Sequence, residues 1–370
     1  MVFSSAARAI RLGQLKWWSE RLEKFRREHR LQYLFWETTH ICNLHCRHCG
    51  SDCGPAAAGE LTTEEIKDVF KSIAEDYDAK TIMVAVTGGE PLMRKDLFDV
   101  MGYASGLGFG WGMVTNGMLV NEEIAEKCAA AGMRTVTVSV DGLRETHDHI
   151  RRFKGSFDRS VRALETFKAS GRLRVVQATT CVSDYNLHEL DQLYDRFKRN
   201  GVDEWRLLTV NPIGRAREDP RFMLKPEQLK QLLDFIVAKR GQKGLSVTFE
   251  EEGFLGPDYE GIVRTGLYYC PAGINIGSIL ADGSIAACPN LPRDYIQGNV
   301  RVDRFRDVWE HEYRRMRDLS WKKAGECAAC QWWPFCQGNS LHLWDIEAGK
   351  PVLCHLRALE EARRRPDNII

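Results

Sequence analysis

The chain has 370 residues, of which 44% are hydrophobic and 28% charged, and its formal net charge at pH 7 is +1. This length and composition allow a large buried core, so a disordered or fibrous protein is excluded. The balanced charge gives no electrostatic footprint for general nucleic-acid binding, and we expect no nucleic-acid partner. No apolar run approaches the roughly 18 residues of a membrane-spanning helix, and the N-terminus lacks the apolar core of a signal peptide. We therefore expect a cytoplasmic protein with no transmembrane segment.

Residues 1–30 are predicted to form an N-terminal helical extension with a basic character. The segment AARAIRLGQLKWWSERLEKFRREHR has a helical pattern and contains the adjacent residues Trp17 and Trp18. It could dock a partner or touch a membrane surface. We favour a helix that packs on the neighbouring barrel and exposes its basic face to solvent.

Residues 31–240 alternate short β-rich runs with helical patterns. The helical segments carry capping signals: the opening of LTTEEIKDVFKSIAEDY at residues 61–65 supplies an N-cap and first-turn acids, and Gly132 closes NEEIAEKCAAA. This alternation predicts a parallel sheet with right-handed crossovers, in which six units curl into an open α/β barrel. The six predicted strands are LQYLFWETT, TIMVAVT, GWGMVT, TVTVSV, RVVQATTCV and WRLLTV.

Polar and glycine-rich segments follow the first four predicted strands. In a barrel of this kind the functional groups lie at the C-terminal ends of the strands, so these segments should converge on one rim. They are a cysteine-rich loop, GGEP at 88–91, TNG at 115–117 and SVDG at 139–142.

Twelve cysteines in a reducing compartment are not expected to form a disulfide framework, so metal or redox chemistry is the leading explanation. Cys128 and Cys181 stand alone in the middle of the chain and are interpreted as buried core thiols. The others form two clusters: Cys42, Cys46, Cys49 and Cys53 near the start, and Cys270, Cys288, Cys327, Cys330, Cys336 and Cys354 near the end.

The first cluster, THICNLHCRHCGSDC at 39–53, has the spacing Cys42-x-x-x-Cys46-x-x-Cys49. A tetrahedral zinc site would need a fourth ligand, which Cys53 or His48 could supply. A four-iron cluster takes one thiolate per iron, so three cysteines leave one iron open to a substrate or cofactor.

This three-cysteine spacing on the loop after the first strand resembles the radical SAM superfamily. The resemblance implies a partial (β/α)6 barrel whose 4Fe-4S cluster, held by Cys42, Cys46 and Cys49, binds S-adenosylmethionine at the open iron. It implies reductive cleavage of that cofactor to a 5'-deoxyadenosyl radical. Cys53 is then a bystander near the cluster.

The segment GGEP resembles the family's GGE motif. There Gly88 and Gly89 allow a close backbone approach, and Glu90, followed by Pro91, would meet the methionyl ammonium group of the cofactor.

Four other residues match cofactor-contacting positions of the family. For His48 the simpler alternative is an exposed loop position, and for Arg151 it is a surface ion pair. The resemblance implies contacts with the adenine, ribose and carboxylate of the cofactor from His48, Asn116, Ser139 and Arg151.

Residues 241–269 contain glycine, proline and acidic residues, which predicts a linker or lid before a second domain at 270–370. Within that domain SILADGSIAACPN predicts a β-hairpin with Asp282 and Gly283 at its turn and Cys288 at its far end.

The C-terminal cysteines resemble the SPASM extension of radical SAM enzymes, with Ser340 where the pattern has its sixth cysteine. The resemblance implies at least one auxiliary iron-sulfur cluster. One partition gives Cys327, Cys330, Cys336 and Cys354 a complete site and leaves Cys270 and Cys288 under-ligated. In the other, as in twitch-type extensions, Cys270, Cys288, Cys327 and Cys330 hold a single cluster. A structural zinc site is a further alternative.

Taken together, the resemblance implies an enzyme that modifies a peptide or small protein and receives electrons from an external donor such as a flavodoxin or ferredoxin. The alternatives are the same chemistry on a small molecule or tetrapyrrole, and an iron-sulfur electron carrier without radical catalysis. The sequence assigns no catalytic acid or base.

Overall fold

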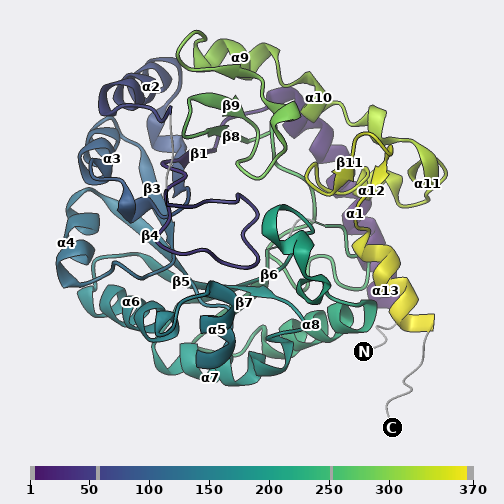
Figure 1. Ribbon diagram of the computed structural model, residues 1–370. Helices are drawn as coiled ribbons and strands as arrows, with labels where there is room; N and C mark the ends of the chain where they lie inside the picture. Colours follow the sequence, from purple (N-terminus) through teal and green to yellow (C-terminus); the bar gives the residue numbers. More distant parts are fainter. Residues whose placement is uncertain (1–4, 56–58, 251–252, 365–370) are drawn as a thin grey trace.

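The computed structural model describes residues 5–55, 59–250 and 253–364, and its centre is a curved sheet (Figure 1). Parallel strands follow one another in chain order from β1 to β7, which confirms the predicted α/β array. The last of them lies inside the segment for which the sequence predicts a linker or lid. The strands are β1 (Tyr33–Glu37), β2 (Met83–Thr87), β3 (Gly110–Thr115), β4 (Met133–Ser139), β5 (Val175–Val182), β6 (Glu204–Thr209) and β7 (Ser246–Phe249).

Helices follow the strands and cover the outer face of the sheet (Figure 1). The predicted cap of the first of these forms as a capping box, in which the Thr62 hydroxyl accepts from the Glu65 amide and the Glu65 carboxylate accepts from the Thr62 amide. The helices are α2 (Thr63–Asp76), α3 (Leu97–Gly106), α4 (Glu122–Ala130), α5 (Arg144–Arg151), α6 (Ser156–Ser170), α7 (Leu190–Arg199) and α8 (Pro226–Lys239).

The predicted hairpin is present and continues the barrel sheet. Strand β8 (Ile276–Ile279) pairs antiparallel with β9 (Ser284–Ala286) and parallel with β1. At the turn Gly283 has φ +83°, and the Asp282 carboxylate accepts from the Ser284 amide at 3.0 Å. The C-terminal region is therefore joined to the barrel by main-chain hydrogen bonds.

Short elements follow the hairpin, and two of the C-terminal cysteines lie in them, Cys327 in α11 and Cys336 in α12. They are β10 (Gly298–Asn299), α9 (Phe305–His311), α10 (Arg314–Arg317), η7 (Ser320–Lys322), α11 (Gly325–Ala328), α12 (Trp333–Cys336), β11 (Trp344–Asp345), β12 (Lys350–Pro351) and α13 (His355–Arg364).

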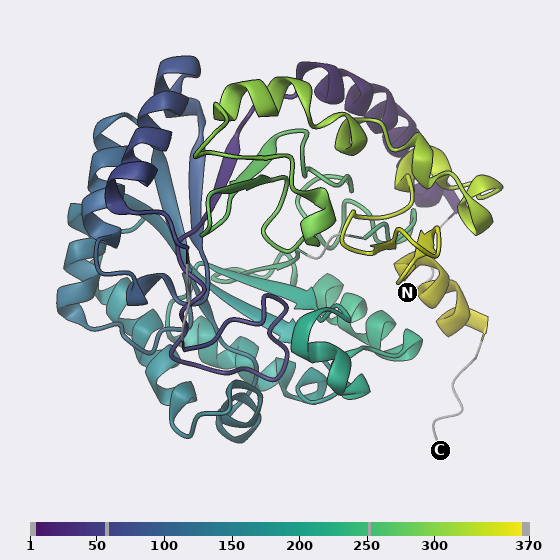
Figure 2. The same ribbon diagram turned by 45° about the horizontal axis from the view of Figure 1, so that its top comes forward.

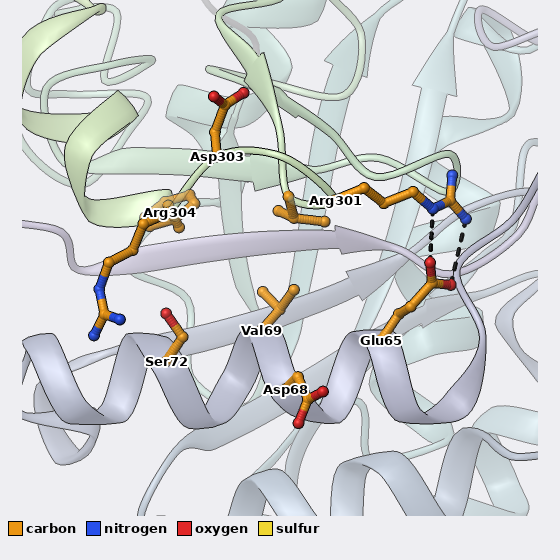
Figure 3. Close-up of a pocket in the computed structure, with 9 residues that line it drawn as sticks. Glu65, Asp68, Val69, Ser72, Arg301, Asp303 and Arg304 are labelled. Carbon is orange, nitrogen blue, oxygen red and sulfur yellow. Dashed lines mark hydrogen bonds and ion pairs between the residues drawn. The ribbon is translucent and has the colours of Figure 1, made fainter.

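A cavity of about 480 Å³ separates α2 from the segment between β10 and α9 on the outside of the barrel. Figure 3 shows Arg301 reaching across to Glu65, with 2.7 Å between its Nε atom and the carboxylate. Acidic and basic side chains share the lining, so this cavity has no dominant charge.

Helix α1 (Ser5–Glu28) lies beside the C-terminal region in both views (Figure 1, Figure 2). Leu15 is buried with Phe254 and Tyr268, and the Trp18 indole donates to the Tyr268 carbonyl at 3.2 Å. The sequence analysis expected this helix to pack on the barrel. These contacts are instead with the segment that follows β7. Trp17 is 55% exposed.

None of the described helices combines the length and apolarity that crossing a bilayer requires.

Candidate functional site

The loop after β1 carries Cys42, Cys46 and Cys49 across the mouth of the barrel (Figure 2). All three thiols line one cavity of about 180 Å³ at the C-terminal ends of the strands. Burial raises the pKa of Cys42 to about 11 and also raises the pKa of Cys46. The cavity therefore holds three closely placed sulfur ligands that are poorly solvated.

Arg94 clamps the two ends of this loop, and the sequence analysis did not single it out. Its guanidinium donates to the Thr38 carbonyl at 2.9 Å and to the Leu61 carbonyl at 2.9 Å. It also pairs with Asp96 at 2.8 Å and lies over the Trp36 ring. The available signal in the sequence was a basic residue three positions after the GGEP segment.

The residues expected to contact the cofactor come together with the thiols, with one exception. Pro91 begins the short helix η2 (Pro91–Met93) behind the cavity wall and is not among the lining residues. The lining includes His48, Gly88, Gly89, Glu90, Asn116, Ser139 and Arg151.

Glu90 is 1% exposed and links the end of β2 to the end of β3. Its carboxylate accepts from the Thr115 hydroxyl at 2.7 Å and from the Asn116 amide at 2.8 Å. Burial raises the pKa of Glu90, and these donors oppose that rise. Because a carboxylate has about four lone-pair sites, it can accept another donor from the cavity.

The glycine pair lets the GGEP segment lie against the backbone of the cysteine loop. The Gly89 amide donates to the Thr39 carbonyl at 2.7 Å, and the Glu90 amide donates to the Ile41 carbonyl at 2.9 Å. A Cβ atom at Gly89 would lie 2.3 Å from the Ile41 oxygen, and Gly88 has φ +144°. Larger residues would push the cysteine loop away.

His48 and Arg151, which line the cavity, belong to a buried ion cluster. Asp141 pairs with Arg151 at 2.6 Å and with the His48 Nε2 atom at 2.9 Å, while the Arg151 guanidinium also donates to the Cys46 sulfur at 3.7 Å. Burial opposes ionisation of Asp141, but Arg151 and His48 overcome it and hold the pKa of Asp141 well below its usual range. The Cys181 sulfur lies within 4.8 Å of ligand atoms of His48 and Asp141.

Asp141 and Arg215 also belong to the site although the sequence analysis did not propose them. Arg215, in η4 (Gly214–Glu218) after β6, donates to the Cys46 carbonyl at 2.8 Å and to the Cys53 carbonyl at 3.2 Å. The signals in the sequence were the acid in SVDG and the segment NPIGRA, with its proline and glycine, directly after a predicted strand.

Cys53, the expected bystander, lies in the same cavity and is 3% exposed. A hydrogen bond from Cys53 lowers the pKa of the Cys49 thiol and raises that of Cys53 itself.

Four C-terminal thiols form a second group. Burial raises the pKa of Cys327 and of Cys336, and the charge of Cys354 raises both further. Burial also raises the pKa of Cys354, and the charge of Cys330 adds to that rise. Cys270 is buried at the base of the hairpin. Burial lowers the pKa of Arg26, and the charge of Cys270 opposes this change. Burial raises the pKa of the Tyr295 phenol, and the charge of Cys270 adds to that rise.

The barrel cavity fits an iron-sulfur cluster with a polar ligand. Its donor set is three thiols, which suits iron, and its glycine pair leaves backbone exposed for a close approach. Within the described residues, the buried Nε atom of Arg151 and Nδ1 atom of His48 have no hydrogen-bond partner. The wall can therefore donate hydrogen bonds to a bound molecule.

Sequence comparison agrees with this geometry. Residues 36–197 match the family model described as the Radical SAM superfamily, and residues 270–331 match SPASM, described as an iron-sulfur cluster-binding domain. The mycofactocin maturase MftC of Mycolicibacterium smegmatis is 33% identical over 314 residues, which cover 83% of this chain and 77% of that protein. The chain belongs to the radical SAM superfamily. The AdoMet-dependent heme synthase of Methanosarcina barkeri is 31% identical over 325 residues, covering 82% of this chain and 89% of that protein.

Two solved structures share the fold. Native anSMEcpe with bound AdoMet has a TM-score of 0.70 at 20% identity, and the match covers 90% of this chain and 96% of that chain. SuiB of Streptococcus suis bound to its precursor peptide SuiA has a TM-score of 0.65 at 16% identity, covering 84% of this chain and 73% of that chain. This radical SAM chain is an enzyme that uses a 4Fe-4S cluster, S-adenosylmethionine and auxiliary iron-sulfur clusters.

Gly89→Ala should lower the free energy of unfolding by about 1–3 kcal/mol, because the new methyl group meets the Ile41 carbonyl and overpacks the site. Gly102→Ala, in α3 with open space around its Cβ position, is the matched control and should be neutral or stabilising. Urea denaturation of both variants measures the difference. Equal urea midpoints for Gly89→Ala and the wild type would contradict this prediction, because they would show that the cysteine loop accommodates the methyl group with no loss of stability.

Acid should destabilise the protein through His147, whose Nδ1 atom accepts from the Asp141 amide at 2.9 Å. Burial lowers the pKa of His147 to about 3 in the folded protein, whereas an unfolded histidine has a pKa of about 6.5. Between pH values of about 6.5 and about 3 the unfolded chain therefore binds a proton at His147 and the folded chain does not. Stability is therefore lost as the pH falls below about 6.5, by about 2 kcal/mol at pH 5.

His147→Asn keeps an acceptor at this position and does not titrate. Its unfolding free energy should fall less between pH 7 and pH 5 than that of the wild type. Denaturant titrations measure this difference. If the unfolding free energies of the two proteins fell equally with pH, the claim that His147 stays neutral in the folded protein would be wrong.

Proposed function

We propose that this radical SAM enzyme modifies a side chain of a peptide or small protein. The observation that carries the proposal is the convergence of three thiols, Glu90 and Arg151 on one cavity, in a chain 33% identical to a mycofactocin maturase. When bound, the cluster supplies the electron that cleaves S-adenosylmethionine to methionine and a 5'-deoxyadenosyl radical, which abstracts hydrogen from the substrate.

Cys42, Cys46 and Cys49 would hold this cluster and leave one iron for the amino and carboxylate groups of the cofactor. Glu90 would accept from the methionyl ammonium group, since its buried carboxylate borders the cavity. Arg151 would neutralise negative charge beside Cys46 and, through its Nε atom, donate to the bound cofactor.

The other lining residues would orient the cofactor. Gly88 and Gly89 would admit its methionyl backbone, with Pro91 fixing the turn behind them, and Asn116 and Ser139 offer polar groups at the ends of β3 and β4. The remaining candidate is His48, whose ring stacks on Phe222 at 5.8 Å between centroids and leaves its Nδ1 atom for a ligand.

For the auxiliary site we favour the partition that gives Cys327, Cys330, Cys336 and Cys354 one cluster, because these thiols act on one another electrostatically. Cys270 and Cys288 would then hold at most an under-ligated cluster. Ser340 is fully buried, and its Oγ atom lacks a hydrogen-bond partner within the described residues, so a hydroxyl is available where the family pattern has a thiolate.

A tetrapyrrole is the second candidate substrate, because the heme synthase of Methanosarcina barkeri is 31% identical over a similar length. Mass spectrometry separates the two candidates: a mass change in a co-expressed candidate peptide supports the first, and conversion of an added iron-porphyrin without peptide modification supports the second. Release of 5'-deoxyadenosine excludes the third reading, an electron carrier without radical chemistry.

We also propose a reducing, cytoplasmic location and an external flavodoxin or ferredoxin as electron donor. Both follow from the need to keep the twelve cysteines reduced and to deliver low-potential electrons to the cluster.

Anaerobic protein reduced with dithionite should release 5'-deoxyadenosine from S-adenosylmethionine, and the Cys42→Ala/Cys46→Ala/Cys49→Ala variant should release none. Cys128→Ala, which removes a fully buried thiol from α4, is the matched control and should retain the activity. Liquid chromatography of the products measures both. Cleavage by the triple variant would refute the assignment of the three ligands.

Glu90→Gln should leave the iron content unchanged and weaken S-adenosylmethionine binding by about 1.5–3 kcal/mol, the usual value of a hydrogen bond to a charged group. Thr115→Val removes one donor to Glu90 but keeps the carboxylate, so it should have a smaller effect. Isothermal titration calorimetry measures both affinities. An unchanged affinity in Glu90→Gln would leave Glu90 only a structural role.

A further inference from the structure

Helix α5 ends in an exposed basic segment beside the cysteine loop. Arg152, Phe153 and Lys154 follow the last residue of the helix, and all three side chains are exposed. The Phe153 ring is 38% exposed, and the Arg159 guanidinium lies 5.4 Å from its centre. Aromatic and arginine side chains are enriched at protein interfaces, so their combination on one turn favours a docking role for this segment.

Main-chain contacts join this segment to the loop that carries the thiols. The Arg47 amide donates to the Ile150 carbonyl at 2.9 Å, and the Arg47 Nε atom donates to the His149 carbonyl at 3.2 Å. The Arg152 amide donates to the same His149 carbonyl at 3.3 Å. One carbonyl at the end of α5 therefore accepts from both Arg47 and Arg152, which places the two residues next to each other.

Both arginines are sequence neighbours of groups in the barrel cavity. Arg47 follows Cys46 directly, so their Cα atoms are about 3.8 Å apart. Arg152 follows Arg151, whose guanidinium donates to the Cys46 sulfur at 3.7 Å. The end of α5 is therefore a short route from solvent to a thiol that would hold the cluster. We call Arg47, Arg152, Phe153 and Lys154 the α5 surface.

The positive charges of the α5 surface are not neutralised within the protein. None of its three cations forms an ion pair with another residue that the structure describes. Acids of the adjoining helices are engaged elsewhere: the Asp148 carboxylate accepts from the Ser156 hydroxyl at 2.8 Å. Asp158 pairs with Arg144, and Glu145 lies in the first turn of α5, at its other end. The surface therefore presents three positive charges to an approaching partner.

Arg152 takes a backbone conformation that glycine would adopt more easily. Its φ is +56°, in the left-handed region where most side chains are strained and only glycine, asparagine and aspartate are common. The end of α5 thus carries a charged side chain at a conformational cost, which favours a role for that charge outside the helix.

We propose that the α5 surface docks a small acidic electron-transfer protein, which passes one electron to the cluster held by Cys42, Cys46 and Cys49. This inference rests on the function proposed above and names the place where its external donor binds. The donor is oxidised by one electron and the cluster is reduced by one, and no bond forms or breaks in the encounter. Complementary charge speeds such an encounter, and salt weakens it by screening the charges.

The test uses the full-length, cluster-loaded protein with a bacterial flavodoxin as the probe. Arg152→Asn/Lys154→Gln removes two charges, and Arg152→Asp/Lys154→Glu reverses them; asparagine and aspartate both tolerate the left-handed conformation. The matched control is Lys16→Gln/Arg27→Gln, which removes two exposed charges from α1, and Figure 1 shows α1 well away from α5. Biolayer interferometry measures the dissociation constant of oxidised flavodoxin, and liquid chromatography measures 5'-deoxyadenosine.

We expect the dissociation constant to rise about tenfold in the neutralised variant and further in the reversed variant, while the control stays at the wild-type value. Raising the ionic strength from about 0.05 M to about 0.5 M should weaken wild-type binding and change that of the reversed variant little. Release of 5'-deoxyadenosine should slow with reduced flavodoxin. It should be unchanged with excess dithionite, a small reductant that needs no docking surface.

An unchanged dissociation constant in the reversed variant overturns the proposal. An equal loss in the control also overturns it, because the effect would then belong to overall charge or to α1. Equal slowing with dithionite and with flavodoxin overturns it too, because the substitutions would then act on the cluster site.

If the α5 variants do not fold, carbodiimide cross-linking of the wild type to flavodoxin decides. An amide bond between Lys154 and a flavodoxin carboxylate, located by mass spectrometry, supports the proposal, and bonds confined to other lysines overturn it. A wild type that binds flavodoxin at the α5 surface but cleaves no S-adenosylmethionine with dithionite would support the docking surface and refute the proposed function.

Discussion

The site depends on the attachment of an irregular loop to the rim of the barrel. The loop carries the thiols, yet its described residues, 38–55 and 59–62, contain no strand or helix apart from an isolated bridge between Ile41 and Gly54. Main-chain hydrogen bonds to the GGEP segment hold its first turn, and the Arg94 guanidinium binds carbonyl groups at both of its ends. Because these bonds are buried, the ordering of the loop is coupled to the folding of the barrel.

Much of this arrangement could be predicted because it depends on local patterns. Apolar runs at a regular spacing predicted the strands, the hydroxyl and acidic residues at 61–65 predicted the start of α2, and Asp282 with Gly283 predicted the hairpin turn. The convergence of strand-end motifs on one rim followed from parallel topology alone. These features are decided by residues close together in the chain, for which single-sequence reasoning is strongest.

The features that were missed depend on partners far apart in the chain. The pairing of β8 with β1 joins segments separated by more than two hundred residues, and the four-residue β7 resembles a linker in composition. Asp141 and Arg215 look like ordinary charged residues in the sequence, and only their contacts with the cysteine loop in the folded chain show that they matter.

The central claim is that Cys42, Cys46 and Cys49 leave one iron of a cluster open to S-adenosylmethionine. Low-temperature electron paramagnetic resonance of the dithionite-reduced protein, with and without the cofactor, tests it most directly. The account predicts that adding S-adenosylmethionine changes the g values of one cluster in the wild type and changes nothing in the triple alanine variant, whose auxiliary signal remains. Identical wild-type spectra at a saturating concentration of the cofactor would contradict it.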